Sequence, residues 1–160
     1  MSVERVDRET PVAHDDRMDI RLWLRLLTCT NLIEARIRRR LRDRYDITLP
    51  RFDVMAQLHR EPEGLQMSEL SRRLMVSNGN VTGLIDRLVA EGLVTSRQHP
   101  ADKRSQIVAL SAAGRAQFEA MLPEHQSWVA EIMSGLSQDQ ITQIYDLLAI
   151  VKAGAGGNDA

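Results

Sequence analysis

The stretch from Gln66 to Gly114 constrains the fold of this chain more than any other part of its sequence. Its apolar residues first recur every three or four positions and then near alternating positions, which predicts two short helices followed by a β-hairpin. Ser68 and Ser77 stand where these helices should begin, since a serine hydroxyl can cap a helix by accepting a hydrogen bond from a free backbone N–H. Gly92 is a suitable stop for the second helix.

Each predicted helix has one apolar face and one polar face. The apolar stripe of the first comprises Leu70, Leu74 and Met75, and that of the second comprises Val81, Leu84, Ile85, Leu88 and Val89. Polar side chains on the other faces, with the two serines at the helix starts, form a candidate DNA-contacting set: Ser68, Ser77, Asn78, Asn80, Thr82 and Arg87. Two helices joined by a turn, with small polar side chains near the start of the second, fit the major groove of DNA.

Residues 93–97 and 106–110 are predicted to be the strands of the hairpin. The turn-prone segment between them contains Asp102, Lys103 and Arg104. Such a basic tip suits a wing that reaches DNA beside the second helix, because a narrow minor groove attracts an arginine guanidinium through its negative potential. The alternative is that Asp102 and Arg104 only hold a solvated hairpin together. We expect both, with Asp102 orienting Arg104.

This run resembles the winged helix-turn-helix of the multiple-antibiotic-resistance regulator (MarR) family of bacterial transcription factors. The matching segments are 70–74, 77, 81–88, 91–94, 102–105 and 110–114, and a looser match of helix pattern extends from about 20 to 152. The resemblance implies a mainly α fold (an α+β winged helix-turn-helix) with about six helices, a two- or three-stranded wing and terminal helices that form a dimer interface. It also implies a homodimer that binds a palindromic operator and often releases it on binding a small ligand. The chain departs from the family at Gly83, where many members carry a basic residue.

The helix patterns outside the winged segment predict a dimerisation frame. Apolar residues from Trp23 to Leu41 mark one long helix, and those from Phe118 to Leu136 mark a second that Pro123 should interrupt and kink. A Ser-x-x-Gln capping box at residues 137–140 starts a last helix. The alternative is that these stripes close one monomeric core. The division predicted is a flexible arm (1–19), a dimerisation helix (20–47), the winged helix-turn-helix (48–110), dimerisation helices (111–152) and a flexible tail (153–160).

The charge distribution is compatible with a nucleic-acid partner although the formal net charge is only −1. Residues 21–110 carry sixteen basic and ten acidic side chains, whereas both ends of the chain are acidic. A basic middle is a modest electrostatic footprint for DNA. Six arginines lie close together near the end of the first predicted helix: Arg36, Arg38, Arg39, Arg40, Arg42 and Arg44. There are two alternatives for them: they are solvated, or they bind phosphate groups of DNA or of a phosphorylated ligand.

Other classes of protein find little support in the sequence. There is no apolar run long enough to cross a membrane, no signal-peptide pattern, and no motif for catalysis, a metal or a cofactor, so we expect a cytoplasmic protein that is not an enzyme. The single cysteine, Cys29, cannot form an intramolecular disulfide and suits a reducing compartment. We expect it to be a buried structural thiol, with peroxide sensing, known in some relatives, as the alternative.

Three function classes remain: a ligand-responsive transcription factor acting as a repressor, an architectural winged-helix protein, and a protein-interaction module with the same fold. The resemblance implies an effector pocket between the first, second and fifth helices. The sequence looks particularly like members that control aromatic-acid catabolism, which suggests an aromatic acid or its coenzyme A thioester, with the arginine cluster near the coenzyme phosphates. Candidate ligand-binding residues, each with core packing or solvation as the alternative, are Trp23, Arg38, Phe52, Met55, His59 and Trp128.

Overall fold

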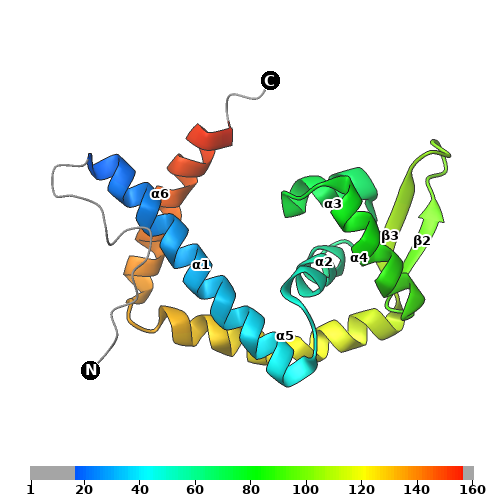
Figure 1. The fold of residues 1–160 in the computed structure, drawn as a ribbon, viewed down its shortest axis with the longest axis horizontal. Coiled ribbons are helices and arrows are strands. Elements are labelled where there is room, and N and C mark those ends of the chain that lie inside the picture. The colour runs from blue at the N-terminus through cyan, green and yellow to red at the C-terminus, as the bar shows by residue number, and fades with distance from the viewer. Residues whose placement is uncertain (1–16, 157–160) are drawn as a thin grey trace. The chain divides into compact units, whose positions relative to one another are not determined.

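The computed structural model describes residues 17–156. These contain six helices and three strands, in the order α1 (Met18–Tyr45), α2 (Leu49–His59), β1 (Leu65–Gln66), α3 (Met67–Leu74), α4 (Asn78–Ala90), β2 (Val94–Gln98), β3 (Gln106–Leu110), α5 (Ala112–Met133) and α6 (Gln138–Gly156) (Figure 1). This element order confirms the predicted mainly α, winged helix-turn-helix fold. The described residues fall into two compact units divided between Leu122 and Pro123, so that α5 belongs to both.

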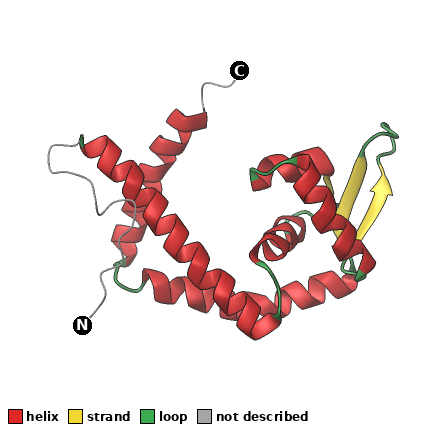
Figure 2. Ribbon diagram, viewed as in Figure 1, coloured by secondary structure: helices red, strands yellow, loops and turns green. Residues whose placement is uncertain are grey.

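The sheet is antiparallel, with β3 in the centre and strand order β1-β3-β2 (Figure 2). The predicted hairpin is present, although its first strand begins at Val94 rather than at residue 93, and Val94 pairs with Leu110. The third strand, β1, is only two residues long and pairs through Leu65 with Val108. Gly64 makes this pairing possible, because its φ is 91° and a Cβ there would lie 2.6 Å from the Val108 carbonyl oxygen.

The core of the first unit surrounds α2. This helix contacts α1, α3, α4 and β3. The largest side chains with almost no exposed surface come from all of these elements and from α5: Leu41, Val54, Met55, Leu58, Leu70, Val81, Leu88, Val108 and Met121. Each such burial contributes about 1.5–3 kcal/mol, so this apolar centre holds the helix-turn-helix and the wing together.

Side-chain caps set the starts of α2, α4 and α6, and those of α4 and α6 were predicted from the sequence. The hydroxyl of Thr48 accepts a hydrogen bond from the Arg51 N–H, and that of Ser77 accepts one from the Asn80 N–H, each at 3.4 Å. At the start of α6, Ser137 and Gln140 form the reciprocal capping box, with distances of 2.9 and 3.2 Å.

Three details of the helix-turn-helix differ from the prediction. Ser68 does not cap α3, because the helix begins one residue before it, at Met67, with Gln66 at the cap position and no side-chain cap bond. Met75 does not belong to the apolar stripe: it ends α3 with a left-handed φ of 55°, which turns it outward and leaves it 91% exposed. Val89 is also exposed, at 39%, since Ile85 and Leu88 already fill the buried face of α4.

The long helices differ from the prediction mainly at their ends. α1 begins at Met18, and α5 runs continuously from Ala112 through Pro123, so the proline does not interrupt it. α6 continues through Gly154 to Gly156, where a tail was expected, because each glycine costs a helix only about 1 kcal/mol relative to alanine. The rest of the predicted arm, residues 1–16, and the last four residues of the predicted tail lie outside the described residues.

Candidate nucleic-acid interface

The start of α4 presents a short row of polar side chains to solvent. Asn78, Asn80 and Thr82 are exposed, and so is Arg87 near the other end of the helix. The Thr82 hydroxyl donates a 2.9 Å hydrogen bond to the carbonyl oxygen of Asn78, which fixes its orientation on the helix surface. The amides of Asn78 and Asn80 carry both donors and acceptors, the combination needed to bind base edges in a major groove.

Glycines interrupt the exposed face of α4. A Cβ added at Gly79 or at Gly83 would meet no atom within 4 Å outside the backbone of its own helix. Both positions are therefore open, and the departure from the family at Gly83 exposes helix backbone instead of a basic side chain. A partner can approach the backbone of α4 more closely here than it could if side chains were present.

The tip of the wing is ordered by Asp102. Its carboxylate accepts the backbone N–H of Arg104 at 3.0 Å, and its carbonyl oxygen accepts the N–H of Ser105 at 3.0 Å. The N–H of His99 in turn donates to the Ser105 carbonyl oxygen at 2.9 Å, which closes the loop. Asp102 therefore orders the main chain at Arg104 and also ties the hairpin together, whereas the contact of Arg104 with DNA stays a prediction. Lys103 and Arg104 are exposed.

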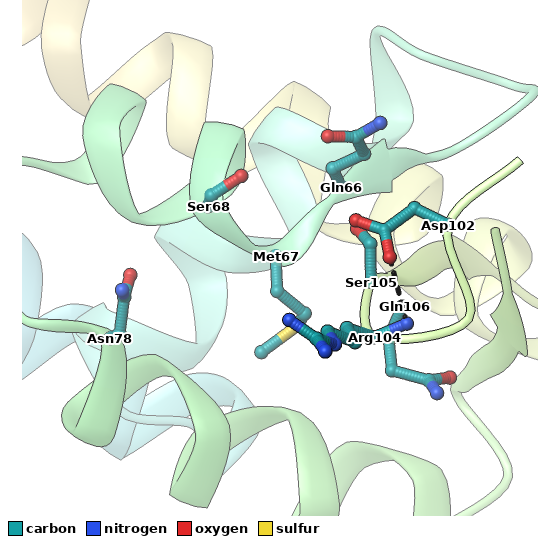
Figure 3. A pocket seen from close by; sticks show the side chains of 8 residues that line it. All are labelled: Gln66, Met67, Ser68, Asn78, Asp102, Arg104, Ser105 and Gln106. Carbon is teal, nitrogen blue, oxygen red and sulfur yellow. Dashed lines mark hydrogen bonds between the residues drawn. The ribbon is translucent and has the colours of Figure 1, made fainter.

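An open hollow of about 400 Å³ lies between the start of α3, the start of α4 and the wing. It brings four predicted residues from these three regions together, namely Ser68, Asn78, Asp102 and Arg104, and adds Gln66, Met67, Ser105 and Gln106 (Figure 3). In this view the Arg104 side chain extends across the hollow beneath Met67. Asn80, Thr82 and Arg87 do not line it. Gln66 was not predicted here because only the pairing of β1 with β3 places it beside the wing, whereas Gln106 lies in the predicted second strand of the wing but was not named as a functional residue.

The basic residues of α3 are engaged with carboxylates. Glu69 accepts hydrogen bonds from Arg72 at 2.7 and 2.9 Å and from Arg73 at 2.8 Å. These bonds, those from Arg72 first, lower the pKa of Glu69 to about 2. Arg73 also pairs with Glu61 at 2.9 Å. Such exposed pairs add little stability, but they reduce the positive charge that α3 offers to DNA, so the wing tip is the more effective basic surface.

The residues predicted to bind a ligand do not share one environment. Phe52 and Met55 are 4% and 0% exposed, and the Phe52 ring lies 5.2 Å from that of Phe118, so both belong to the core. His59 is half-buried, with its ring 5.0 Å from Phe118 and its Nε2 atom 3.0 Å from Glu119 Oε1. In the second unit, Trp128 is 8% exposed and lies edge-on to His125.

The predicted residues on α1 are more accessible. Trp23 is 57% exposed, and the Arg38 guanidinium lies 3.6 Å from the Glu34 carboxylate one turn away. Most of the arginine cluster is exposed, which agrees with the solvated interpretation, while Ile37 and Leu41 are the buried residues of this part of the helix. Cys29 is exposed, so the expectation of a buried thiol is wrong.

Metal and membrane sites are not found in the part of the chain that the structure describes. Residues 17–156 contain no group of three or more histidine, cysteine, aspartate or glutamate side chains placed to hold a metal ion. Within the same residues, every helix is too short or too polar to span a bilayer.

Comparisons with known proteins agree on one family. The model of the MarR family matches residues 47–106, which span α2, the helix-turn-helix and most of the wing. The chain is 29% identical to the transcriptional activatory protein BadR of Rhodopseudomonas palustris, over 94% of this chain and 93% of that protein. Among solved structures, a MarR family transcriptional regulator from Silicibacter pomeroyi is 30% identical, with 90% of this chain and 99% of that chain covered and a TM-score of 0.73. A mutant MarR from E. coli complexed with operator DNA is 27% identical, with 83% and 94% covered and a TM-score of 0.74.

Proposed function

This chain belongs to the MarR family, and we propose that it represses genes from a palindromic operator, which it binds as a homodimer and leaves when a small aromatic ligand binds. Its family makes it a DNA-binding transcriptional regulator rather than an enzyme. The proposal rests chiefly on the hollow shared by Asn78 and Arg104, because it puts the start of α4 and the basic wing on one surface. As a regulator of transcription it would act in the cytoplasm.

The two parts of this surface have different tasks in the proposal. The start of α4 enters a major groove, where Asn78, Asn80 and Thr82 bind base edges. Ser68, Ser77 and Arg87 bind phosphates, which hold the helix in register without reading sequence. In the wing, Arg104 and Lys103 reach the adjacent minor groove, with Asp102 holding the tip in shape.

The homodimer is supported by the apolar surface of the terminal helices. None of the residues of α6 is buried, although Ile144, Leu148 and Val151 lie on it at helical spacing and are 43%, 38% and 45% exposed. On α1, Leu22 and Trp23 are exposed as well. Exposed apolar side chains of this kind on each helix are unfavourable in water, and a second copy of the same helices would cover them.

An aromatic acid or its coenzyme A thioester is the proposed effector class. Trp23 and His59 in the first unit, and separately Trp128 in the second, are the proposed contacts for its aromatic part, and Arg38 and its neighbours are those for the phosphates of a thioester, since arginine matches phosphate geometry. Phe52 and Met55 would support the contacts of the first unit from the core. The ligand would hold the α4 helices (the recognition helices) of the two protomers at a separation that no longer matches the distance between successive major grooves.

One experiment tests both halves of the proposal. Random DNA bound by the purified protein is selected and sequenced, and aromatic acids and aryl coenzyme A thioesters are then screened for release of the selected DNA. A short palindrome and a releasing compound support the proposal. Linkage then requires saturating operator to weaken ligand binding by the same factor, which is typically about 5–150-fold. Binding without sequence preference, and without any releasing compound, would favour the architectural alternative.

Repression is the second point to test, because the relative BadR is named as an activator. A reporter gene placed behind the selected operator should be expressed more strongly when the regulator gene is deleted. Lower expression in the deletion strain would assign activation instead.

Trp23→Ala should blunt ligand release with little change in DNA affinity, since Trp23 is exposed, whereas Phe52→Ala would damage the core.

A further inference from the structure

The C-terminal end of α4, the recognition helix of the proposed function, is held by two contacts. Glu91, the residue that caps α4, forms an ion pair with Arg51 in the first turn of α2. The next residue, Gly92, accepts a 2.6 Å hydrogen bond at its carbonyl oxygen from the hydroxyl of Ser111, which precedes α5. The serine contact joins segments that meet at the base of the wing. The ion pair, in contrast, connects the start of α2 with the end of α4 through two long side chains.

Each partner of the ion pair stands at the wrong end of its own helix. Arg51 is the third residue of α2, where the N-terminal end of the helix dipole disfavours a positive charge. Glu91 follows the last residue of α4, where the C-terminal end disfavours a negative charge. Local electrostatics would therefore favour the opposite charge at both positions. Residues that conflict with their local surroundings are expected where a tertiary or functional requirement outweighs the local preference.

Arg51 is well placed to transmit its position to α4. Its backbone N–H is held by the Thr48 hydroxyl, and its side chain is only 21% exposed. Glu91 is 46% exposed, and an ion pair that solvent reaches in this way adds little to global stability. The ion pair has a larger effect on the direction of α4 than on stability. α4 is about 20 Å long at 1.5 Å per residue, so a 5° tilt about Glu91 moves Asn78 by about 1.7 Å, which is enough to break a hydrogen bond to a base.

We propose that Arg51 is a positioning residue for DNA recognition: through its ion pair with Glu91 it sets the direction of α4 and thereby the bases that Asn78 and Asn80 can reach. The inference rests on the proposed sequence-specific function. It assigns Arg51 an effect on which operator is preferred, in addition to any effect on how tightly DNA is bound.

The test compares Arg51→Met, Glu91→Gln, the double variant and the charge exchange Arg51→Glu/Glu91→Arg. Methionine keeps the apolar stem of Arg51 and removes its charge. Arg115→Gln is the matched control, because it removes an arginine from a pair with Glu119 that lies within α5. For each protein, affinity is measured for the selected operator and for a panel of single base-pair variants, at several salt concentrations, together with the melting temperature.

Arg51→Met and Glu91→Gln should each weaken operator binding about tenfold, with no further loss in the double variant, since both remove one charged contact. They should also change the ranking of the base-pair variants while the salt dependence stays as in the parent. The charge exchange should restore the parent ranking, and Arg115→Gln should leave it unchanged.

Three results would overturn the inference. An unchanged ranking, with affinity lost only in proportion to the melting temperature, would assign Arg51 a purely structural role. A salt slope reduced by about one would mean that Arg51 itself binds a phosphate. A parent protein without any sequence preference would instead remove the proposed function, and this inference with it, before any variant is compared.

Discussion

The Ser111 hydroxyl lies 2.6 Å from the carbonyl oxygen of Gly92 and donates a hydrogen bond to it, which ties the start of α5 to the segment just after α4. The same hydroxyl accepts the N–H of Gly114 at 3.0 Å, and the Ser111 N–H donates to the Leu93 carbonyl oxygen at 3.0 Å. A Cβ on Gly114 would lie 1.9 Å from that oxygen. This close approach explains why position 114 is a glycine.

Gly114→Ala should therefore destabilise the protein by about 3 kcal/mol, at the upper end of the usual cost of overpacking, because backbone and not a flexible side chain stands in the way. Gly83→Ala is the matched control: it also adds one methyl group to a helix, but into open space, and should stabilise by up to about 1 kcal/mol. The free energies of unfolding in urea provide the measurement. Equal effects of the two substitutions would contradict the proposed contact.

Arg104→Ala should weaken operator binding by about 1–3 kcal/mol without loss of the fold, since the exposed wing tip lies outside the core. Asp102→Ala should cause a smaller loss, because it frees the Arg104 backbone but keeps the guanidinium. Fluorescence anisotropy with labelled operator at moderate salt measures both. A folded Arg104→Ala protein with parental affinity would exclude a DNA contact by this arginine.

Asp53 carries an unfavourable charge at neutral pH. It lies on α2 beside a small hollow lined by Pro50, Leu74, Val76 and Leu84. Although the residue as a whole is exposed, partial burial of its carboxyl and repulsion from Glu34 raise its pKa from 3.8 to about 6. The folded protein therefore holds this proton between about pH 4 and 6 while the unfolded chain has lost it. Asp53 consequently reduces stability progressively as pH rises through this window, and the full penalty is present above it.

Asp53→Asn should therefore make the protein more stable than the parent at pH 7.5, and this advantage should disappear at about pH 3, below both pKa values, where Asp53 is largely protonated in both states. Solvent access to the side chain makes the gain smaller than the pKa shift alone implies. Thermal unfolding of both proteins at the two pH values measures it, with Asp146→Asn on α6 as the control. A gain that is equal at both pH values would show that burial of the charge is not its cause.

The purified protein should be a dimer that protects a two-fold symmetric site, with half-site centres about 34–36 Å apart. The reason is the apolar surface of α6, which includes Leu147 and Ile150 at 63% and 70% exposure. Light scattering at micromolar concentration and footprinting provide the measurements. Glutamate in place of Ile150 should shift the protein toward monomers, and a parental monomer on an asymmetric site would refute the arrangement.

Local signals along the chain were sufficient to predict most of the helix starts. Ser77 and the pair Ser137 and Gln140 cap helices as expected, because a cap requires only residues within three or four positions of one another. The same holds for the polar start of α4 and the basic tip of the wing, whose turn is closed by Asp102. The fold class and the candidate DNA surface follow from such local patterns, since their spacing along the chain matches a known arrangement.

Contacts between distant segments could not be predicted in this way. Nothing near Ser68 reveals that β1 pairs with β3 and starts α3 one residue earlier, and the apolar character of Met75 conceals the left-handed turn that exposes it. The pairing of Arg51 with Glu91 opposes the local preference of both helices, so no helix rule predicts it. The sequence by itself determined the helices, the wing and the polar face of α4, whereas only the tertiary structure decided how α4 is held, because that depends on side chains brought together by packing around α2.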